Sequence, residues 1–200
     1  ANATVVVVTG SGTSRTVTLS SITGDGTLGI SIAPGTATDL AGNSAPAAVS
    51  GTFLVDNTTP TVTIGAPSSN FTMNGPVTYA VSYADANFGG SALTAEKLSL
   101  NKTGTANGIA SVTGSGANYT VAIASISGEG TLGISIAAET ATDLAGNAAT
   151  GATATTFIVD NTAPTLTISA PSTSFAKSGP VTYTVTYADA NFNASTLTAA

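Results

Sequence analysis

Short runs of alternating apolar and polar residues, separated by turns rich in glycine, asparagine and aspartate, dominate the chain. The clearest run covers residues 77–84. Its odd-numbered positions are all large and apolar or aromatic: Val77, Tyr79, Val81 and Tyr83. A period of two places alternate side chains on opposite faces of a β-strand. We therefore predict a strand here with one buried and one exposed face.

The same pattern predicts further strands between residues 57 and 160. They lie at residues 61–65, 97–102, 109–113, 119–126, 131–137 and 153–159. Glycine-rich turns at residues 114–116 and 128–130 separate strands, because glycine adopts backbone conformations that other residues avoid. No stretch has a convincing helical period, although residues 91–98 could form a short turn. The expected fold class is all-β.

The sequence repeats itself at a constant spacing. The stretch ATDLAGNSAPAAVSGTFLVDNTTPTVTI, residues 37–64, recurs at residues 141–168 as ATDLAGNAATGATATTFIVDNTAPTLTI. Equivalent residues, such as Tyr79 and Tyr183, are 104 positions apart throughout. This register predicts three parts. They are the C-terminal half of one copy at residues 1–56, a complete copy at residues 57–160, and the N-terminal half of a third copy at residues 161–200.

The length of the repeat indicates what kind of unit it is. A repeat of this size is too long for one rung of a solenoid. It matches an independent β-sandwich domain, which has about 100 residues and about seven short strands. We therefore expect each complete copy to fold as a separate β-sandwich.

Three motifs in the repeat resemble those of a known family. A TDLAGN loop at residues 38–43 and 142–147 is combined with a VDNTxP connector at residues 55–60 and 159–164. Both motifs follow a GxGTLGISI strand. Together they resemble the bacterial immunoglobulin-like repeats of large surface adhesins and biofilm-associated proteins.

This resemblance covers the whole chain and implies a fold, a location and a function. It implies tandem immunoglobulin-like Greek-key β-sandwiches with a 104-residue repeat, forming a stalk or fibre at a bacterial cell surface or outside the cell. Calcium commonly binds near the domain junctions of such proteins. Adhesion to surface glycans or to other cells is then expected of regions outside this segment.

Composition and charge exclude several classes of function. Ten acidic and four basic residues give a net charge of −6, and the basic residues form no cluster. We expect no nucleic-acid partner, since phosphate recognition needs clustered lysine and arginine. The absence of histidine and cysteine removes the usual general base, the usual zinc ligands and any disulfide. The longest aliphatic run, residues 5–8, is far shorter than a membrane span, so no membrane insertion is expected in this segment.

We expect no enzymatic activity. The acidic residues occur among turn residues, whereas carboxylate pairs that hydrolyse glycosides need a cleft. The Gly-x-Gly sequences at residues 24–26 and 128–130 precede strands, whereas phosphate-binding loops precede helices. A carbohydrate-binding module array is an alternative function, and an exposed aromatic pair would favour it.

The aromatic residues that recur in two copies are expected in the core, or next to bends, rather than on a sugar-binding face. They are Phe53, Phe71, Tyr79, Tyr83 and Phe88, with Phe157, Phe175, Tyr183, Tyr187 and Phe192 as counterparts. Tyr119 differs, because its counterpart is Arg15. We therefore expect Tyr119 at an exposed start of a strand.

The acidic residues recur at shared positions, since eight of the ten fall at four positions common to two copies. In a sandwich of alternating strands, the connector before the first strand, the loop after the second and the loop before the last lie at one end. In the complete copy these three loops carry Asp56, Asn57, Asp85, Asn87, Asp143 and Asn147. Calcium takes about six to eight oxygen ligands from carboxylates, amides, backbone carbonyls and water. We therefore predict a calcium site at this junction.

The flanking copies carry the equivalent candidate ligands. These are Asp39, Asn43, Asp160, Asn161, Asp189 and Asn191. Asp25 and Glu129, in a turn at the opposite end of a domain, are expected to add a ligand across a junction. Without an ion the carboxylates would repel one another and loosen the connector, whereas calcium would lock it to the domain that follows.

Two other interpretations of these loops stay open. Aspartate and asparagine also suit tight turns, because their short polar side chains bond to nearby backbone groups. Magnesium fits less well than calcium, because it demands stricter geometry.

The two half-copies are nearly complementary in sequence. Residues 1–56 and 161–200 together supply one copy without the segment matching residues 97–104. Each half alone should expose sheet edges and apolar faces. Either neighbouring chains complete each other head to tail and form a filament or sheath, or the sequence is a segment of a longer tandem array. The expected partners are therefore neighbouring repeats or other copies of the same chain.

Overall fold

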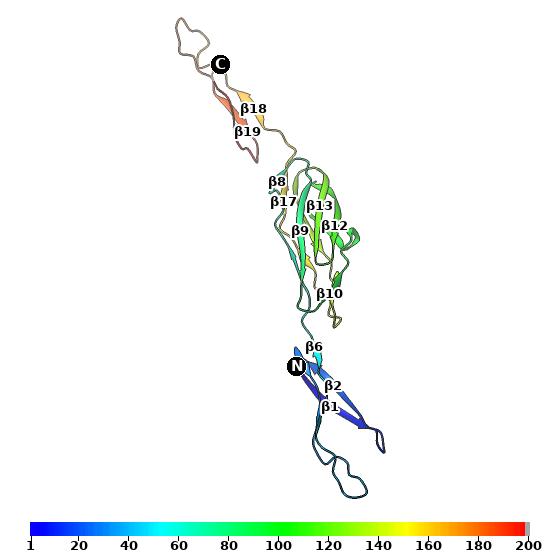
Figure 1. Cartoon of the computed structure of the whole chain (residues 1–200). Coiled ribbons are helices and arrows are strands. Elements are labelled where there is room, and N and C mark those ends of the chain that lie inside the picture. Colours follow the sequence, from blue (N-terminus) through cyan, green and yellow to red (C-terminus); the bar gives the residue numbers. More distant parts are fainter. Residues whose placement is uncertain (199–200) are drawn as a thin grey trace.

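The computed structural model describes residues 1–198 and shows an elongated, all-β molecule (Figure 1). A complete β-sheet unit lies in the middle, and a smaller group of strands extends from each end. The helical element in the described range is a single 3-10 turn, η1 (Ala95–Lys97), within the stretch where a short turn was expected. No helix among these residues is long and apolar enough to cross a membrane.

Residues 57–160 form two main sheets. The first is antiparallel, with the strand order β12 (Asn107–Ser115), β13 (Asn118–Ser127), β9 (Val77–Ala84) and β7 (Thr61–Ile64). The second has the order β11 (Leu98–Lys102), β14 (Gly130–Ile136), β17 (Phe157–Val159) and β8 (Phe71–Thr72), and β16 (Ala152–Thr153) pairs beside β14. Only the pair β17–β8 is parallel among the strand pairs of the described residues. The arrangement is consistent with a β-sandwich.

The core lies between these sheets, and strand β9 shows why. Its odd-numbered residues from Val77 to Tyr83 are buried and its even-numbered residues are more exposed, so the predicted alternation is confirmed. Val121 of β13 pairs with Tyr79 in the same sheet. Side chains from the other sheet close the core, with Leu132 and Ile134 from β14 and Phe157 from β17. Full burial of one such apolar side chain, relative to leaving it exposed to water, stabilises the folded state by about 1.5–3 kcal/mol.

Two short strands that the sequence pattern did not predict close one end of this unit. Strand β10 (Phe88–Ser91) pairs with β15 (Ala141–Asp143). Their sequences, FGGS and ATD, carry no alternation of apolar and polar residues. This pairing, together with the 2.8 Å hydrogen bond from the Leu144 N–H to the Asn87 carbonyl, holds the loop that begins at Asp143 beside the loop that follows β9.

The predicted strand at residues 153–159 is divided into β16 and β17. The backbone between them serves other contacts, because the Thr155 carbonyl accepts a hydrogen bond of 2.9 Å from the Tyr79 hydroxyl. Ala154 donates its N–H to the Ile134 carbonyl at 2.9 Å.

The expected exposure of Tyr119 is wrong. Tyr119 is buried, and its ring meets Tyr83 edge to face, with the centroids 6.0 Å apart. Its hydroxyl donates to the Ser91 carbonyl at 3.2 Å, so β10 covers the start of β13. The prediction from the counterpart Arg15 was wrong because, within residues 1–198, no equivalent of β10 lies over Arg15.

The expected burial of the recurring aromatic residues holds for only part of the set. Tyr79, Tyr83 and Phe157 are buried, and Phe88 packs against the core. Phe71 is exposed, because it lies on the short edge strand β8. In the half-copies Phe53, Phe175, Tyr183 and Phe192 are also exposed.

The N-terminal half-copy forms three pairs of strands. They are β1 (Asn2–Thr9) with β2 (Thr16–Thr23), β3 (Gly26–Leu28) with β6 (Phe53–Val55), and β4 (Ser31–Ile32) with β5 (Ala48–Val49). In the C-terminal half-copy β18 (Thr165–Ile168) pairs with β19 (Val185–Ala188). Thr165 lies opposite Ala188 there, as Thr61 lies opposite Ala84 in the central unit.

Candidate functional site

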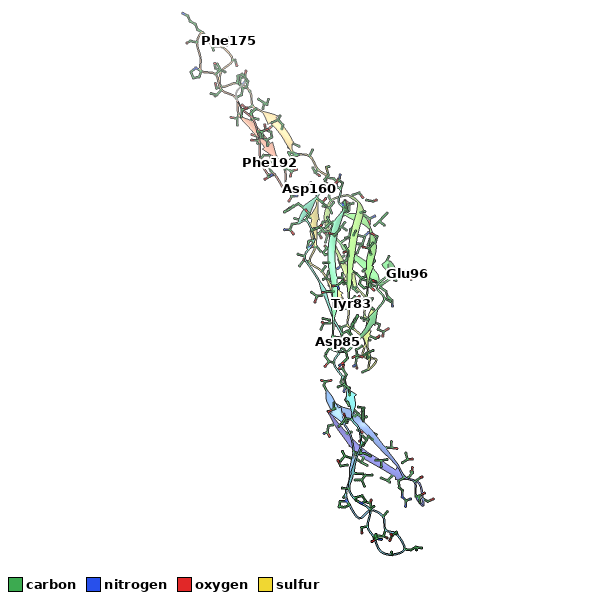
Figure 2. The ribbon with its side chains drawn as sticks, in the orientation of Figure 1. Tyr83, Asp85, Glu96, Asp160, Phe175 and Phe192 are labelled. Atoms are coloured by element: carbon green, nitrogen blue, oxygen red, sulfur yellow. The ribbon has the colours of Figure 1, made fainter. Side chains whose placement is uncertain are left out.

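Three carboxylates converge at the end of the central unit that faces the N-terminal half-copy. One oxygen each of Asp56, Asp85 and Asp143 lies within 4.8 Å of the other two. Asp56 follows β6, Asp85 follows β9, and Asp143 ends β15. Figure 2 shows Asp85 at this narrow junction. Segments distant in the sequence therefore meet here because their strands end at the same pole.

Each of these aspartates is fixed by a turn of its own backbone. Asp85 Oδ1 accepts the Asn87 N–H at 2.7 Å, and Asp56 Oδ1 accepts the Thr58 N–H at 3.0 Å. Asp143 Oδ1 accepts the Asn147 N–H at 2.8 Å. Such turns are the ordinary conformation of short polar side chains followed by free backbone N–H groups. They position the three carboxylates through hydrogen bonds within their own loops.

Two asparagine side chains tie the three loops together. Asn87 Nδ2 donates to Asp56 Oδ2 at 2.6 Å. Asn147 Nδ2 donates to Asp143 Oδ2 at 2.7 Å and to the Asp56 carbonyl at 2.9 Å. The connector that carries Asp56 is thereby bonded to both loops of the following unit.

The cluster concentrates negative charge in a partly enclosed position. Asp143 is 5% exposed, and Asp56 and Asp85 are half-buried. Within residues 1–198, the hydrogen bonds to these carboxylates come from neutral amides. Burial of Asp143 opposes its ionisation, but the hydrogen bonds from Asn147 and the loop backbone outweigh this and lower its pKa. Asp143 is therefore ionised at neutral pH.

The donor set fits a calcium ion. Oxygens that bind one calcium at roughly 2.3–2.6 Å can lie up to about 5 Å apart, and the three carboxylate oxygens satisfy this limit. Each carboxylate has about four lone-pair directions, of which the hydrogen bonds above use one or two. Second carboxylate oxygens, loop carbonyls and water could supply the remaining ligands.

The second connector carries part of the same arrangement. Asn191 Nδ2 donates to Asp160 Oδ2 at 2.7 Å, and the Asn191 N–H donates to Asp189 Oδ1 at 2.7 Å. A cleft of about 700 Å³ lies beside this pair, with Phe71 and Phe192 also in its lining. Figure 2 labels Asp160 and Phe192 between the central unit and the C-terminal half-copy.

Asp25 accepts a hydrogen bond from Asn57 and is not part of the three-aspartate cluster. The Asn57 N–H donates to Asp25 Oδ1 at 2.6 Å, and Asn57 Nδ2 donates to the Gly24 carbonyl at 2.7 Å. Thr58 Oγ1 donates to Asp25 Oδ2 at 3.3 Å. The connector is thus held to the preceding half-copy by a contact that sequence reasoning missed. The signal was present, since an acidic residue and the DNT sequence recur together.

The same contact recurs one repeat later with a glutamate. The Asn161 N–H donates to Glu129 Oε1 at 2.7 Å, and Thr162 Oγ1 donates to the same oxygen at 2.9 Å. Asn161 Nδ2 donates to the Gly128 carbonyl at 2.8 Å. Either acid can therefore fasten the connector to the turn before it.

Asp39 and Asn43 form an isolated copy of the Asp143 loop. Asn43 Nδ2 donates to Asp39 Oδ2 at 2.7 Å, and the Asn43 N–H donates to Oδ1 at 2.9 Å. The side-chain hydrogen bond from Asn43 is the main cause that lowers the pKa of Asp39. Among the described residues, the acidic cluster with metal-ligand spacing is the one at Asp56, Asp85 and Asp143, and Asp39 does not belong to a cluster of this kind.

Comparison of the chain with protein-family models, with curated proteins and with solved structures finds no match. The likeness to bacterial immunoglobulin-like repeats therefore stays a resemblance of motifs.

Proposed function

We propose that the chain is a structural stalk of tandem immunoglobulin-like Greek-key β-sandwiches, stiffened by calcium at the domain junctions. The observation that carries this proposal is the convergence of Asp56 from the connector with Asp85 and Asp143 from the following unit. An ion bound by all three would join the connector directly to the domain. The elongated shape suits a spacer (Figure 1).

The connector is held from both sides, which explains how one ion could set the stiffness. On the preceding side Asp25 binds the backbone of Asn57 and the hydroxyl of Thr58. On the following side Asn87 and Asn147 bind Asp56. The three negative charges repel one another and so oppose the attachment of the connector to the following unit. A divalent cation bound between them would replace this repulsion with attraction.

The motif resemblance supplies the cellular setting of the proposal. The TDLAGN and VDNTxP sequences resemble those of bacterial surface adhesins and biofilm-associated proteins, which suggests an extracellular or cell-surface location. The proposal gives the chain a mechanical role and no catalytic one. Recognition of glycans or of other cells would then belong to regions outside this segment.

Calcium titration of the full chain tests the proposal. Calorimetry should show binding, thermal unfolding should shift to higher temperature, and small-angle X-ray scattering should show a narrower range of end-to-end distances. Asp85→Asn should weaken all three effects, because it removes one of the three carboxylates.

Glu96→Gln is the matched control, because Glu96 is an exposed acid on η1, away from the junction (Figure 2). This variant should respond to calcium as the unaltered chain does. If EDTA leaves both the unfolding temperature and the scattering unchanged, calcium has no structural role here.

A further inference from the structure

Strands β10 and β15 form a two-stranded ribbon that connects two of the acid-bearing loops in the central unit. The loop that begins at Asp85 leads directly into β10 at Phe88, and β15 ends at Asp143. Phe88 lies opposite Asp143 in the antiparallel register. Beyond the ribbon, the Leu144 N–H donates to the Asn87 carbonyl at 2.8 Å. The separation of Asp85 and Asp143 therefore depends on how this ribbon is held.

The ribbon is too small to hold its own position. Strand β10 has four residues and β15 has three, and the register between them shifts between Phe88 and Gly90. Within residues 1–198, neither strand pairs with a third strand. An isolated pair of strands is at best marginally stable in water. The place of the ribbon must therefore come from its contacts with the rest of the central unit.

Gly89 allows the two strands of the ribbon to approach closely at the carboxylate loop. A Cβ atom placed on Gly89 would lie 2.8 Å from the backbone carbon and oxygen of Asp143 and 3.0 Å from the Thr142 oxygen. Any side chain at this position would therefore displace Asp143. The next residue differs, since among the described residues no heavy atom beyond its chain neighbours lies within 4 Å of a Cβ placed on Gly90.

Tyr83 of β9 anchors both strands of the ribbon at the end of the core. Its hydroxyl donates to Thr140 Oγ1 at 2.9 Å, directly before β15, and both side chains are buried. Its ring stacks against Phe88 at the start of β10, with the centroids 6.4 Å apart. Figure 2 shows Tyr83 inside the central unit, next to the end that carries Asp85.

Tyr119 of β13 anchors the other end of β10. Its hydroxyl donates to the Ser91 carbonyl at 3.2 Å and accepts a hydrogen bond of 3.1 Å from Ser91 Oγ. The Thr140 carbonyl accepts the Ala92 N–H at 2.9 Å, so the chain leaving β10 is also tied to the segment before β15. Two buried tyrosines on neighbouring strands of one sheet therefore support the whole ribbon.

We propose that Gly89, Tyr83, Tyr119 and Thr140 are positioning residues of the calcium site, which act by holding the β10–β15 ribbon and, through it, Asp143 in place. This inference rests on the proposed function, because it assigns these residues to the site at Asp56, Asp85 and Asp143. They supply no ligand atom themselves. Their role is to keep the carboxylate loops arranged for the ion before it binds.

A firmly held ribbon also bears on the choice of cation. Magnesium needs its oxygen ligands at about 2.0–2.1 Å, whereas calcium accepts about 2.3–2.6 Å and tolerates irregular geometry. The loops would have to move closer together to bind magnesium, and a fixed ribbon opposes this movement. Loosening the ribbon should therefore reduce the preference for calcium as well as the affinity for it.

The two adjacent glycines of β10 provide a matched test in the full chain. Gly89→Ala should weaken calcium binding about 10–100-fold, the range typical for groups that orient metal ligands. It should also narrow the ratio of calcium to magnesium affinity. Gly90→Ala makes the same chemical change one residue further along and should leave both quantities unchanged. Calorimetric titration with each metal alone measures them.

The hydroxyl of Thr140 tests the anchor at Tyr83. Thr140→Val keeps the shape of the side chain but removes the acceptor for the Tyr83 hydroxyl, so calcium binding should weaken. Thr140→Ser restores the hydroxyl and should restore most of the affinity. Equal affinity in the valine and serine variants would overturn the role of this hydrogen bond.

Amide hydrogen exchange in EDTA separates positioning from general stability. Gly89→Ala should speed exchange of the Leu144 N–H, which is bonded to the loop of Asp85, while amides of β13 and β14 keep their rates. Acceleration by one factor throughout the central unit would mean that the variant is only less stable, and would overturn the positioning role.

The calcium titration distinguishes this inference from the function on which it rests. Equal calcium affinity of Gly89→Ala and the unaltered chain would overturn the positioning role and leave the calcium-stiffened stalk standing. Absence of calcium binding by the unaltered chain would overturn the proposed calcium site and, with it, any role of the ribbon in positioning that site.

Discussion

The side-chain amide of Asn87 donates a 2.6 Å hydrogen bond to Oδ2 of Asp56, which lies 31 residues earlier in the chain. The backbone N–H of the same Asn87 donates to Asp85 at 2.7 Å, so one neutral residue bridges two carboxylates. Asn191 makes the same two bonds to Asp160 and Asp189. This bridge holds the carboxylates of Asp56 and Asp85 close together.

Removal of the bridge should weaken calcium binding without abolishing it. Asn87→Ala leaves all three carboxylates in place but frees Asp56 from Asp85. The lost hydrogen bond should also lower the free energy of unfolding of the metal-free chain by about 1 kcal/mol. Calorimetry with calcium and thermal unfolding in EDTA measure the two effects. Asn191→Ala, the same change at the second connector, should leave the calcium affinity and the free energy of unfolding of the central unit unchanged. An equal effect of Asn191→Ala would contradict a calcium site at Asp56, Asp85 and Asp143.

The sign of the effect of Asp85→Asn on stability should depend on calcium. In EDTA the substitution removes one of three neighbouring negative charges, so the unfolding temperature should rise or stay constant. In calcium the same substitution removes a ligand, so the unfolding temperature should fall below that of the unaltered chain. Differential scanning calorimetry under both conditions measures this reversal. A variant that is less stable under both conditions would show that Asp85 serves the turn alone.

Acid should destabilise the metal-free chain through Asp143. Burial opposes ionisation of Asp143, but hydrogen bonds from Asn147 and the loop backbone lower its folded pKa below the ordinary value of 3.8. A lowered folded pKa gives stability that is present above the unfolded pKa and is lost as the pH falls through the folded pKa. Unfolding in EDTA should therefore become easier as the pH falls below about 4, and Asp143→Asn should flatten this dependence. Asp39→Asn, at the isolated loop of the half-copy, should leave the dependence of the central unit in place.

Alkali should destabilise the central unit through Tyr79. Burial raises the pKa of its hydroxyl from 10.0 to about 12. A raised folded pKa of an acid favours the protonated form, so its stabilising effect is complete below pH 10.0 and is lost as the pH rises toward 12. Ultraviolet absorbance of tyrosinate, followed together with circular dichroism, should show Tyr79 ionising as the fold opens. Tyr79→Phe should flatten this loss, whereas Tyr183→Phe, at the exposed counterpart, should not.

The sequence predicted the fold where local pattern decided the structure. The alternation in β9 is confirmed because one face of that strand is buried along its whole length. The constant spacing of the repeat and the alternation of strand direction predict Asp56, Asp85 and Asp143 at one pole, and the structure brings one oxygen of each within 4.8 Å of the others. Whether they hold an ion stays a prediction.

The sequence failed where distant contacts decided the structure. Tyr119 is buried because Ser91 and Tyr83 lie against it, and neither contact can be read from its neighbours in the chain. The pair β10–β15 has no apolar alternation, so only its position next to the turn after β9 explains it. The contact of the connector with the preceding turn was also missed, because the Asn57 side-chain amide donates to the Gly24 carbonyl at 2.7 Å across 33 residues of sequence. The role of Asn57 as a calcium ligand stays a prediction.

The contact between Asp25 and the connector should control flexibility more than stability. Asp25→Ala removes the acceptor for the Asn57 N–H and for Thr58 Oγ1, while the cluster at Asp56, Asp85 and Asp143 keeps its own hydrogen bonds. The central unit should therefore unfold at the same temperature, but small-angle X-ray scattering should show a wider range of angles between it and the N-terminal half-copy. Glu129→Ala should produce the same change at the second connector, because Glu129 makes the matching bonds to Asn161 and Thr162. Unchanged scattering in both variants would mean that the asparagine bonds to the Gly24 and Gly128 carbonyls are enough to hold the connectors.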